Sequence, residues 1–475
     1  MQSTLAALVA DAALGSSATM HDGSSADTSV VISGIVYDSR RVQTGSLFCC
    51  LRGVSSDGHD FAEVACAAGA GALLVDQVLP IAVPQVVVVD TRAAMGSLSA
   101  AFFGHPSRSL VVVGVTGTNG KTTTASLIAS ILDSAGLPTG VIGTLTGKHT
   151  TPEAPELQAR LAEFLAAGKQ AVVMEVSSHA LQLHRVTGTR FALAVFTNLG
   201  RDHLDLHGTV ERYFAAKALL FHPSLSAQGI ANADDPRGRL LLDAAPIPML
   251  GFSRKELIDL QVSPTEHRYT WRGEQVVVGI GGAFNAMNSL AAATAAAALG
   301  IDPSAVAAGL RVAAAVPGRF EPVRAGQPFD VIVDYAHTPD GLREALAAAR
   351  SASVSGRVLA VFGCGGDRDR DKRPEMGAVA AELADVVVVT SDNPRSEDPL
   401  AIINAVIEGV PDGYRRHVVS EPDRRRAFAA AFQAARAGDV VVIAGKGHET
   451  TQTIGSDVVP FDDRAVAREL LEAAQ

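Results

Sequence analysis

Residues 114–123 read Gly114-Val115-Thr116-Gly117-Thr118-Asn119-Gly120-Lys121-Thr122-Thr123. They follow an apolar, β-branched run at 110–114, which is typical of a buried parallel strand, and they lead into a helical pattern at 122–132. A glycine-rich loop in this setting turns backbone N–H groups and the positive end of a helix towards phosphate oxygens. Lys121 supplies a charge for the β- and γ-phosphates, and the Thr122 hydroxyl can bind Mg²⁺. The stretch therefore predicts a nucleotide-binding P-loop.

The loop departs from the general pattern G-x-x-x-x-G-K at one position. The pattern requires glycine at 115, where this chain has Val115, and Gly114 lies one residue too early. We therefore expect a variant P-loop. The alternative is a glycine-rich turn that contains Gly-Lys-Thr by chance.

Strand and helix patterns alternate on both sides of the loop. Further strands are expected at 171–176, 191–197 and 276–280, with helices between them, which indicates a doubly wound parallel sheet with ligands at the strand C-termini. A turn cluster at 104–107 ends a smaller N-terminal α/β unit, whose strands are expected at 30–32, 72–75 and 86–89.

A second boundary falls at Val316-Pro317-Gly318-Arg319, and four more strands follow it, at 331–335, 358–362, 386–390 and 440–444. The sequence thus predicts three α/β domains, at 1–108, 109–318 and 319–475. We expect a ligand-binding cleft between the second and third domains.

Composition narrows the class of protein. The 475 residues exceed one ordinary core, and 47% hydrophobic with 19% charged residues is a globular composition. A net charge of −10 argues against a general nucleic-acid binder. The N-terminus lacks a signal-peptide pattern, and the longest apolar stretch, 290–301, is too short to cross a bilayer. The four cysteines lack zinc-site spacing and suit reduced thiols, so we expect a cytoplasmic protein without membrane insertion.

Phosphates need a divalent cation, and candidate ligands follow two of the central strands. Glu175 closes the strand at 171–176, and Asp202 and His203 follow the strand at 191–197. Carboxylates and neutral imidazole both suit a catalytic Mg²⁺ site. The alternative is that His203 is a hydrogen-bonded loop histidine without a ligand.

Further motifs occur with this loop in an order that one known family shares. They are Glu175-Val176-Ser177-Ser178-His179, Thr197-Asn198-Leu199, Ala283-Phe284-Asn285, Pro317-Gly318-Arg319-Phe320 and Asp334-Tyr335-Ala336-His337-Thr338-Pro339. The ordered set runs from Asp38-Ser39-Arg40 to Gly445-Lys446-Gly447-His448-Glu449, nearly the whole chain. The chain thus resembles the Mur ligases of peptidoglycan synthesis.

The resemblance implies three domains: an N-terminal UDP-binding domain, a central P-loop ATPase domain and a C-terminal Rossmann-like domain that binds an amino acid. It implies an ATP-dependent ligase that converts the D-glutamate side-chain carboxylate of UDP-N-acetylmuramoyl-L-alanyl-D-glutamate to an acyl phosphate, which an amine then attacks. Its substrates are small molecules, and we expect a monomer.

The same resemblance assigns roles to residues of the two larger domains. ATP would contact Gly117, Thr118, Asn119, Gly120, Lys121, Thr122, Thr123, Asn285, Arg319, Asp334 and His337. Catalysis would depend on Lys121, Glu175, His203 and Lys217, and the Mg²⁺ ligands would be Thr122, Glu175, His203 and Lys217, the last as a carbamate formed with CO₂. Without the resemblance, Lys217 reads as a solvated helix residue.

Two further sets would bind the acceptor and the amine. The muramoyl-dipeptide would meet Ser39, Thr150, Thr151, Ser177 and Arg185; Leu183 stands where some relatives carry Gln. The stretch 392–395 resembles the version that selects meso-diaminopimelate, and the set comprises Arg368, Asp392, Asn393, Pro394, Arg395, Gly445 and Glu449. A guanidinium fork at Arg395 can clamp the distal carboxylate, which lysine lacks.

Two alternatives stay open. The first is a ligase of the same superfamily that adds lysine, D-Ala-D-Ala or, on folate, glutamate; the N-terminal domain argues against the folate enzyme. The second is a P-loop regulatory or scaffold protein without ligase activity. That class would be expected to lack a lysine or a metal ligand, yet the full set is present in this chain.

Overall fold

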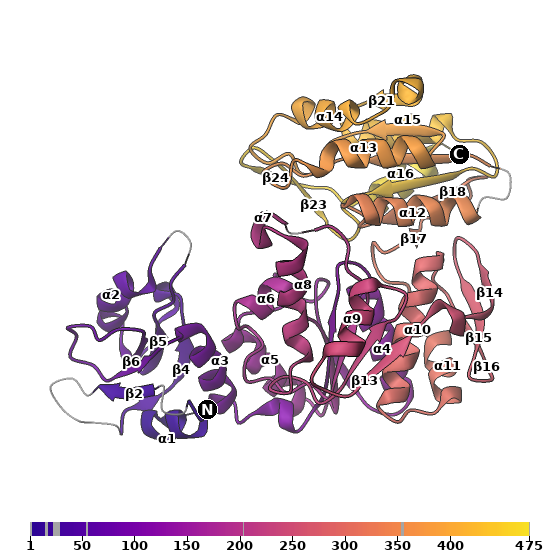
Figure 1. Ribbon diagram of the computed structural model, residues 1–475. Helices are drawn as coiled ribbons and strands as arrows, with labels where there is room; N and C mark the ends of the chain where they lie inside the picture. The colour runs from indigo at the N-terminus through magenta and orange to yellow at the C-terminus, as the bar shows by residue number, and fades with distance from the viewer. Residues whose placement is uncertain are drawn as a thin grey trace.

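The computed structural model describes residues 2–14, 18–21, 29–53, 56–202, 204–352 and 356–474. The three largest sheets, of five, six and six strands, each form the centre of one lobe. The C-terminal lobe lies above the central one and the N-terminal lobe to its side (Figure 1). Within these residues, no helix combines the length and the apolar character that crossing a membrane requires.

The N-terminal lobe is built on a five-stranded sheet in the order β2-β7-β6-β5-β4. Its strands are β2 (Ala18–His21), β4 (Gly34–Val36), β5 (Ser46–Cys49), β6 (Ala70–Val75) and β7 (Gln85–Val88). Its helices are α1 (Leu5–Asp11), α2 (Ala62–Ala67) and α3 (Thr91–Phe102), and the short strands β1 (Ser3–Thr4) and β3 (Val31–Ile32) pair with each other. Apolar side chains of β5 and β6 are buried on both faces, which places helices on both sides.

The central lobe is a six-stranded parallel sheet in the order β13-β12-β11-β8-β10-β9. Its strands are β8 (Val111–Thr116), β9 (Thr139–Ile142), β10 (Ala171–Glu175), β11 (Leu193–Phe196), β12 (Gly229–Asn232) and β13 (Met249–Phe252). The chain runs from β8 to β9 on one side of the sheet, and from β10 it crosses past β8 to β11 on the other side, so the strand order reverses at β8. Its C-terminal end is thus the crevice where open α/β sheets bind ligands.

Helices cover both faces of the central sheet. They are α4 (Lys121–Ser134), α5 (Ala154–Ala166), α6 (Ser178–Gln182), α7 (Leu204–His207), α8 (Val210–Ala218), α9 (Pro236–Ala244), α10 (Ala283–Ala298) and α11 (Pro303–Arg311). The alanine-rich α10 packs closely against α4, which starts at the glycine-rich loop.

One strand assignment from the sequence is wrong. The segment expected at 276–280 belongs to β16 (Glu274–Val278), which forms a separate antiparallel sheet with β14 (Ile258–Val262) and β15 (His267–Trp271). Arg272 and Gly273 both have positive φ, 49° and 84°, which forms a two-residue hairpin between β15 and β16. Such a turn enforces antiparallel pairing and therefore excludes β16 from the parallel sheet.

The C-terminal lobe is a second open sheet, in the order β17-β18-β22-β19-β20-β21. Its strands are β17 (Glu321–Pro322), β18 (Asp330–Asp334), β19 (Val358–Phe362), β20 (Val386–Val389), β21 (Val418–Ser420) and β22 (Val440–Ala444), with a hairpin of β23 (Thr451–Ile454) and β24 (Asp457–Pro460) beside it. Its helices are α12 (Pro339–Ala352), α13 (Lys372–Leu383), α14 (Pro399–Glu408), α15 (Arg424–Ala434) and α16 (Asp463–Ala473).

Candidate active site

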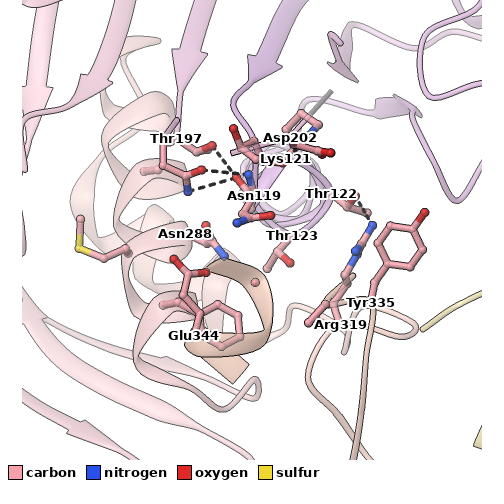
Figure 2. A pocket seen from close by; sticks show the side chains of 18 of the residues that line it. Asn119, Lys121, Thr122, Thr123, Thr197, Asp202, Asn288, Arg319, Tyr335 and Glu344 are labelled. Atoms are coloured by element: carbon pink, nitrogen blue, oxygen red, sulfur yellow. Dashed lines mark hydrogen bonds between the residues drawn. The ribbon is translucent and has the colours of Figure 1, made fainter. Parts of the chain in front are cut away.

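A cavity of about 620 Å³ lies between the C-terminal end of the central sheet and the C-terminal lobe (Figure 2). Most of the residues expected to contact ATP line it: Thr118, Asn119, Gly120, Lys121, Thr122, Thr123, Arg319, Asp334 and His337. Glu175, Lys217, Thr150 and Ser177 line the same cavity. Residues as far apart in the sequence as Thr118 and His337, 219 positions, therefore line one cavity.

The glycine-rich loop occupies the turn between β8 and α4. Gly117 and Gly120 have φ of 149° and 82°, a region that favours glycine. A Cβ on Gly117 would collide with the Thr197 hydroxyl, and a Cβ on Gly120 would collide with the Asn288 amide. Helix α4 begins at Lys121 and points its N-terminus at the cavity, as an anion site requires.

Two lysines converge on the carbonyl of Gly117. Lys121 Nζ donates to this oxygen at 3.0 Å and to the carbonyl of Thr118 at 2.8 Å, and Lys217 Nζ donates to Gly117 at 2.8 Å. Lys217 is only 1% exposed, so it is not the solvated helix residue that its sequence context alone suggests. Burial, and then the charge of Lys121, holds the pKa of Lys217 well below its usual range.

An aromatic ring also packs against the Lys217 side chain. Its Nζ lies 4.5 Å from the ring centroid of Tyr213, whose hydroxyl is 3.2 Å from the Thr118 Oγ1. These contacts fix the lysine at the phosphate loop, on a helix, α8, that the central sheet positions.

Glu175 sits at the end of β10 and bonds to the loop. Its carboxylate accepts from the Thr122 hydroxyl at 2.9 Å and from the amide of Thr144 at 2.8 Å. Hydroxyl and carboxylate oxygens are donors that Mg²⁺ prefers, so this pair fits one side of a Mg²⁺ site. The described residues contain no grouping of three or more His, Cys, Asp or Glu that could hold a metal, and His203 falls outside them.

Arg319 brings the C-terminal lobe to the phosphate loop. Its guanidinium donates to Thr122 Oγ1 at 3.1 Å and lies 4.3 Å from the ring centroid of Tyr335 (Figure 2). Asp334 accepts from the amides of Phe320 and Ala336 at 2.7 and 2.8 Å, which secures the segment after Arg319. The structure therefore shows the lobes in contact over the cavity.

His337 is neutral in this setting. Its Nδ1 lies 2.9 Å from the Tyr335 carbonyl, and burial lowers its pKa to about 4. Asn285, by contrast, does not line the cavity: its side chain donates to the Gly281 carbonyl and accepts from Asn288, which does line it.

The five residues expected at the acceptor are spread more widely. Thr150 and Ser177 line the cavity, whereas Thr151 is buried and accepts from the Ser177 amide at 3.1 Å. Arg185 donates to the Thr151 carbonyl at 3.1 Å and pairs with Glu153 at 2.8 Å. Ser39 lies in the N-terminal lobe, in the short 3₁₀ segment Ser39–Arg41.

The residues expected to bind the amino acid form a second cluster, at the C-terminal ends of β20 and β22. Asn393 donates to Glu449 at 2.8 Å, and a Cβ on Gly445 would lie 2.7 Å from the Asp392 carboxylate. Lys446, fully buried, donates to Glu449 at 3.1 Å and to the Thr451 carbonyl at 2.6 Å. This cluster thus carries charges of both signs, as a site for a zwitterion requires.

The two arginines of this set flank one glycine. A Cβ on Gly365 would lie 3.0 Å from Arg395 Nη1 and 3.7 Å from Arg368 Cγ. Arg395 has φ of 51° and donates to the Gly366 carbonyl at 2.7 Å, and the buried Pro394 precedes it. The unusual backbone at Arg395 turns its side chain back towards the loop after β19.

An ion pair inside the C-terminal lobe holds the C-terminal ends of β20 and β22 together. Arg424 and Asp463 are both fully buried and bond at 2.6 and 2.8 Å. Arg424 also donates to the carbonyls of Ser391 and Ala444 at 3.2 and 3.1 Å, next to Asp392 and Gly445.

We expect Asp463→Ala to lower the free energy of unfolding of this lobe by about 3–5 kcal/mol, because it leaves the Arg424 charge buried without a partner. Urea denaturation, followed by circular dichroism, measures this free energy of unfolding. Glu469→Ala, which breaks the exposed pair with Arg425, is the matched control and should leave the midpoint nearly unchanged. Equal shifts for both variants would contradict this reading of the buried pair.

Several cavity residues were missed in the sequence. Asn288, Tyr335 and Glu344 line the cavity, and Lys446 joins the amino-acid cluster. Asn288 lies one helical turn after Asn285, a spacing that could have signalled it; nothing local marks Glu344, because its place depends on how the lobes pack.

Three family models match consecutive parts of the chain. They are "Mur ligase family, catalytic domain" at residues 31–103, "Mur ligase middle domain" at 115–296, and "Mur ligase, glutamate ligase domain" at 318–447. Curated relatives named UDP-N-acetylmuramoyl-L-alanyl-D-glutamate–2,6-diaminopimelate ligase include one from Gloeobacter violaceus, 48% identical, and one from Syntrophomonas wolfei, 46% identical, with 93% of this chain and 94% of each relative covered.

Solved structures agree with these matches. One of an enzyme with that same name is 35% identical, has a TM-score of 0.66, and covers 93% of this chain and 95% of its own. A MurF ligase from Thermotoga maritima in complex with ADP shares the fold, with a TM-score of 0.64 at 20% identity and 93% and 98% coverage. The expectation of a three-domain α/β architecture is confirmed. On its sequence, its domain order and its fold, the chain belongs to the Mur ligase family.

Proposed function

We propose that this protein is an ATP-dependent ligase that adds meso-2,6-diaminopimelate to UDP-N-acetylmuramoyl-L-alanyl-D-glutamate during peptidoglycan precursor synthesis. The observation that carries the proposal is the 46–48% identity, over 93% of the chain, to curated relatives with that printed name. The cavity between the central and C-terminal lobes supports it, because it joins a P-loop to residues of the lobe that would bring the amine.

The proposed reaction transfers the γ-phosphoryl group of ATP to a carboxylate. A carboxylate repels an attacking amine, and conversion to an acyl phosphate supplies a good leaving group. Lys121 and Arg319, which both reach the phosphate loop, would neutralise charge on the transferring group. Contact between the lobes would exclude water that could hydrolyse the intermediate.

We further propose that Thr122 and Glu175 bind Mg²⁺, with His203, and that Lys217 reacts with CO₂ to a carbamate that gives oxygen ligands for a second Mg²⁺. The lowered pKa of Lys217 supports the carbamate, because only the neutral amine attacks CO₂. The oxygen donors of Thr122 and Glu175, 2.9 Å apart, support the first ion.

The domain roles follow from the same proposal. Residues 1–108 would hold the UDP part of the acceptor, 109–318 would bind ATP, and 319–475 would bind diaminopimelate. We place the reaction in the cytoplasm, as its use of ATP implies, and propose a monomer.

Arg395 would select the amino acid. Diaminopimelate carries a distal carboxylate, and lysine in its place would leave the Arg395 fork without a partner. Arg368, on the other side of Gly365, would make a second carboxylate contact, and Gly445 and Glu449 would meet the distal ammonium.

Arg395→Ala should raise the KM for diaminopimelate by about 10–100-fold, because a charge-assisted, bidentate contact is lost, while the KM for ATP stays the same. Steady-state phosphate release at varied diaminopimelate measures both constants. Arg416→Ala, on an exposed surface of the same lobe, is the control. An unchanged diaminopimelate KM in Arg395→Ala would remove Arg395 from the site.

The function itself is tested by ligation of the muramoyl-dipeptide nucleotide with a panel of amines, followed by mass spectrometry. We expect product with meso-diaminopimelate and little with lysine or D-Ala-D-Ala. Equal or better turnover with lysine would overturn the assigned amine. ATP hydrolysis that needs neither acceptor nor amine would favour a nucleotide-binding protein without ligase activity.

A further inference from the structure

Arg368 lies in the loop that follows β19, and its own side chain does not fix where it points. The residue is exposed, and within the described part of the chain its guanidinium makes no hydrogen bond or ion pair. A long, freely rotating side chain without partners can face many directions. The direction of Arg368 therefore depends on the backbone that carries it.

That backbone has an unusual conformation just before Arg368. Asp367 has φ of 54°, in the left-handed region that few residues other than glycine adopt. Such a conformation persists where surrounding contacts hold it in place. The Asp367 carboxylate accepts from the hydroxyl and the amide of Ser396, at 2.7 and 3.2 Å, which joins this loop to the one after β20.

An ion pair beneath the loop holds its backbone. Glu397 accepts from the amide of Asp367 at 2.6 Å, and the same carboxylate binds both Nη atoms of Arg373 at 2.8 and 3.0 Å. Arg373, near the start of α13, also donates to the Gly365 carbonyl at 3.3 Å. The two side chains are only 4% and 14% exposed. The pair thus contacts the loop backbone on both sides of Gly366.

The geometry of this pair suits a positioning role. A planar guanidinium that binds a carboxylate through two nitrogens fixes both the distance and the angle between them. Arg370 reaches the same carboxylate at 3.2 Å but is 70% exposed, so it contributes little. Arg395 has backbone contacts of its own, since its amide donates to Thr453 and its carbonyl accepts from Gly455.

We propose that Glu397 and Arg373 are positioning residues for the diaminopimelate site: their ion pair holds the backbone at Gly365 and Asp367 and so directs Arg368 at a substrate carboxylate. Neither residue touches the substrate in this role. The inference rests on the proposed function and adds what orders the site before the amino acid binds. A contact that is ordered in advance binds more tightly, because less freedom is lost on binding.

Glu397→Gln tests the ion pair, because glutamine has the same size but no charge and only one acceptor oxygen. We expect the KM for diaminopimelate to rise about 10-fold and the KM for ATP to stay within about twofold. Steady-state phosphate release measures both constants. Glu382→Gln makes the same change in the exposed pair with Arg343, on the same helix as Arg373, and should alter neither constant.

A double-mutant cycle shows whether the pair acts through Arg368. In an Arg368→Ala background, Glu397→Gln should change the KM for diaminopimelate by less than about threefold, because the side chain that it positions is gone. A purely structural role would give the full rise in both backgrounds and would raise the KM for ATP as well. Either of those results, or an unchanged diaminopimelate KM in folded Glu397→Gln, would overturn the inference.

Arg373→Lys decides the question if Glu397→Gln does not fold. Lysine keeps the buried charge, but a single ammonium lacks the planar fork that binds Glu397 and the Gly365 carbonyl together. We expect its KM for diaminopimelate to rise at least about threefold, with thermal melting as the check that it is folded. An unchanged KM in folded Arg373→Lys would also overturn the inference. A wild type that does not turn over diaminopimelate would instead overturn the proposed function.

Discussion

Lys121→Met is expected to lower the kcat of ligation by about 10³-fold, since it removes the cation that would neutralise the transferring phosphoryl group. In the structure, Lys121 Nζ is held by the carbonyls of Gly117 and Thr118, so the charge is already positioned before ATP arrives. Burial lowers the pKa of Lys121, while Glu175 and Asp202 counteract that shift and favour the charged form. Phosphate release at saturating substrates measures the loss.

Lys169→Met provides the control for Lys121. Lys169 lies in the turn between α5 and β10, away from the cavity, and its replacement should leave kcat unchanged. A Lys121→Met enzyme that retains more than a tenth of wild-type kcat would contradict the role assigned to this lysine.

Lys217→Arg should reduce turnover by about 10³-fold or more, while ADP still binds. Arginine keeps the positive charge but cannot form the carbamate that would give oxygen ligands to Mg²⁺ near the γ-phosphate. The wild-type enzyme should also lose activity in CO₂-depleted buffer and regain it when bicarbonate is added. Phosphate release with and without bicarbonate measures both effects, and ¹³C NMR after ¹³CO₂ labelling should show a carbamate signal that the Arg variant lacks.

The controls for Lys217 distinguish chemistry from packing. ADP affinity and the melting temperature report whether the larger arginine side chain disrupts the loop around Gly117. Lys169→Arg should keep its full response to bicarbonate. Full activity of folded Lys217→Arg, or wild-type turnover that is indifferent to CO₂, would exclude the carbamate.

Short runs of β-branched residues predict many of the strands. The β-branched run before Gly117 predicts β8, and strands β19 and β22 begin and end where their valine-rich runs do. Strands β9, β12 and β13 were missed because each has four residues with a glycine or small side chains, a pattern too short to read. The strand expected at 276–280 was wrongly placed in the parallel sheet, because a valine run alone does not indicate strand direction. The hairpin at Arg272-Gly273 sets that direction.

The site was predictable where residues of one motif act together, and not where distant elements meet. Glu175 and Lys121 follow strand ends or a loop pattern, and the structure brings both to the cavity. The burial of Lys217 and the exposure of Glu344 to the cavity depend on packing between helices and lobes, which local sequence does not encode. The pair of Arg424 and Asp463 is likewise visible only once α15 and α16 lie together.

In the proposed reaction, the γ-phosphoryl group of ATP passes to a carboxylate oxygen of the acceptor. The most direct test uses acceptor whose D-glutamate side-chain carboxylate is labelled with ¹⁸O, together with ATP, Mg²⁺ and diaminopimelate. An acyl phosphate intermediate leaves one carboxylate oxygen on the released phosphate, so mass spectrometry should find phosphate that carries a single ¹⁸O in step with product. Unlabelled phosphate, formed as product accumulates, would exclude an acyl phosphate intermediate.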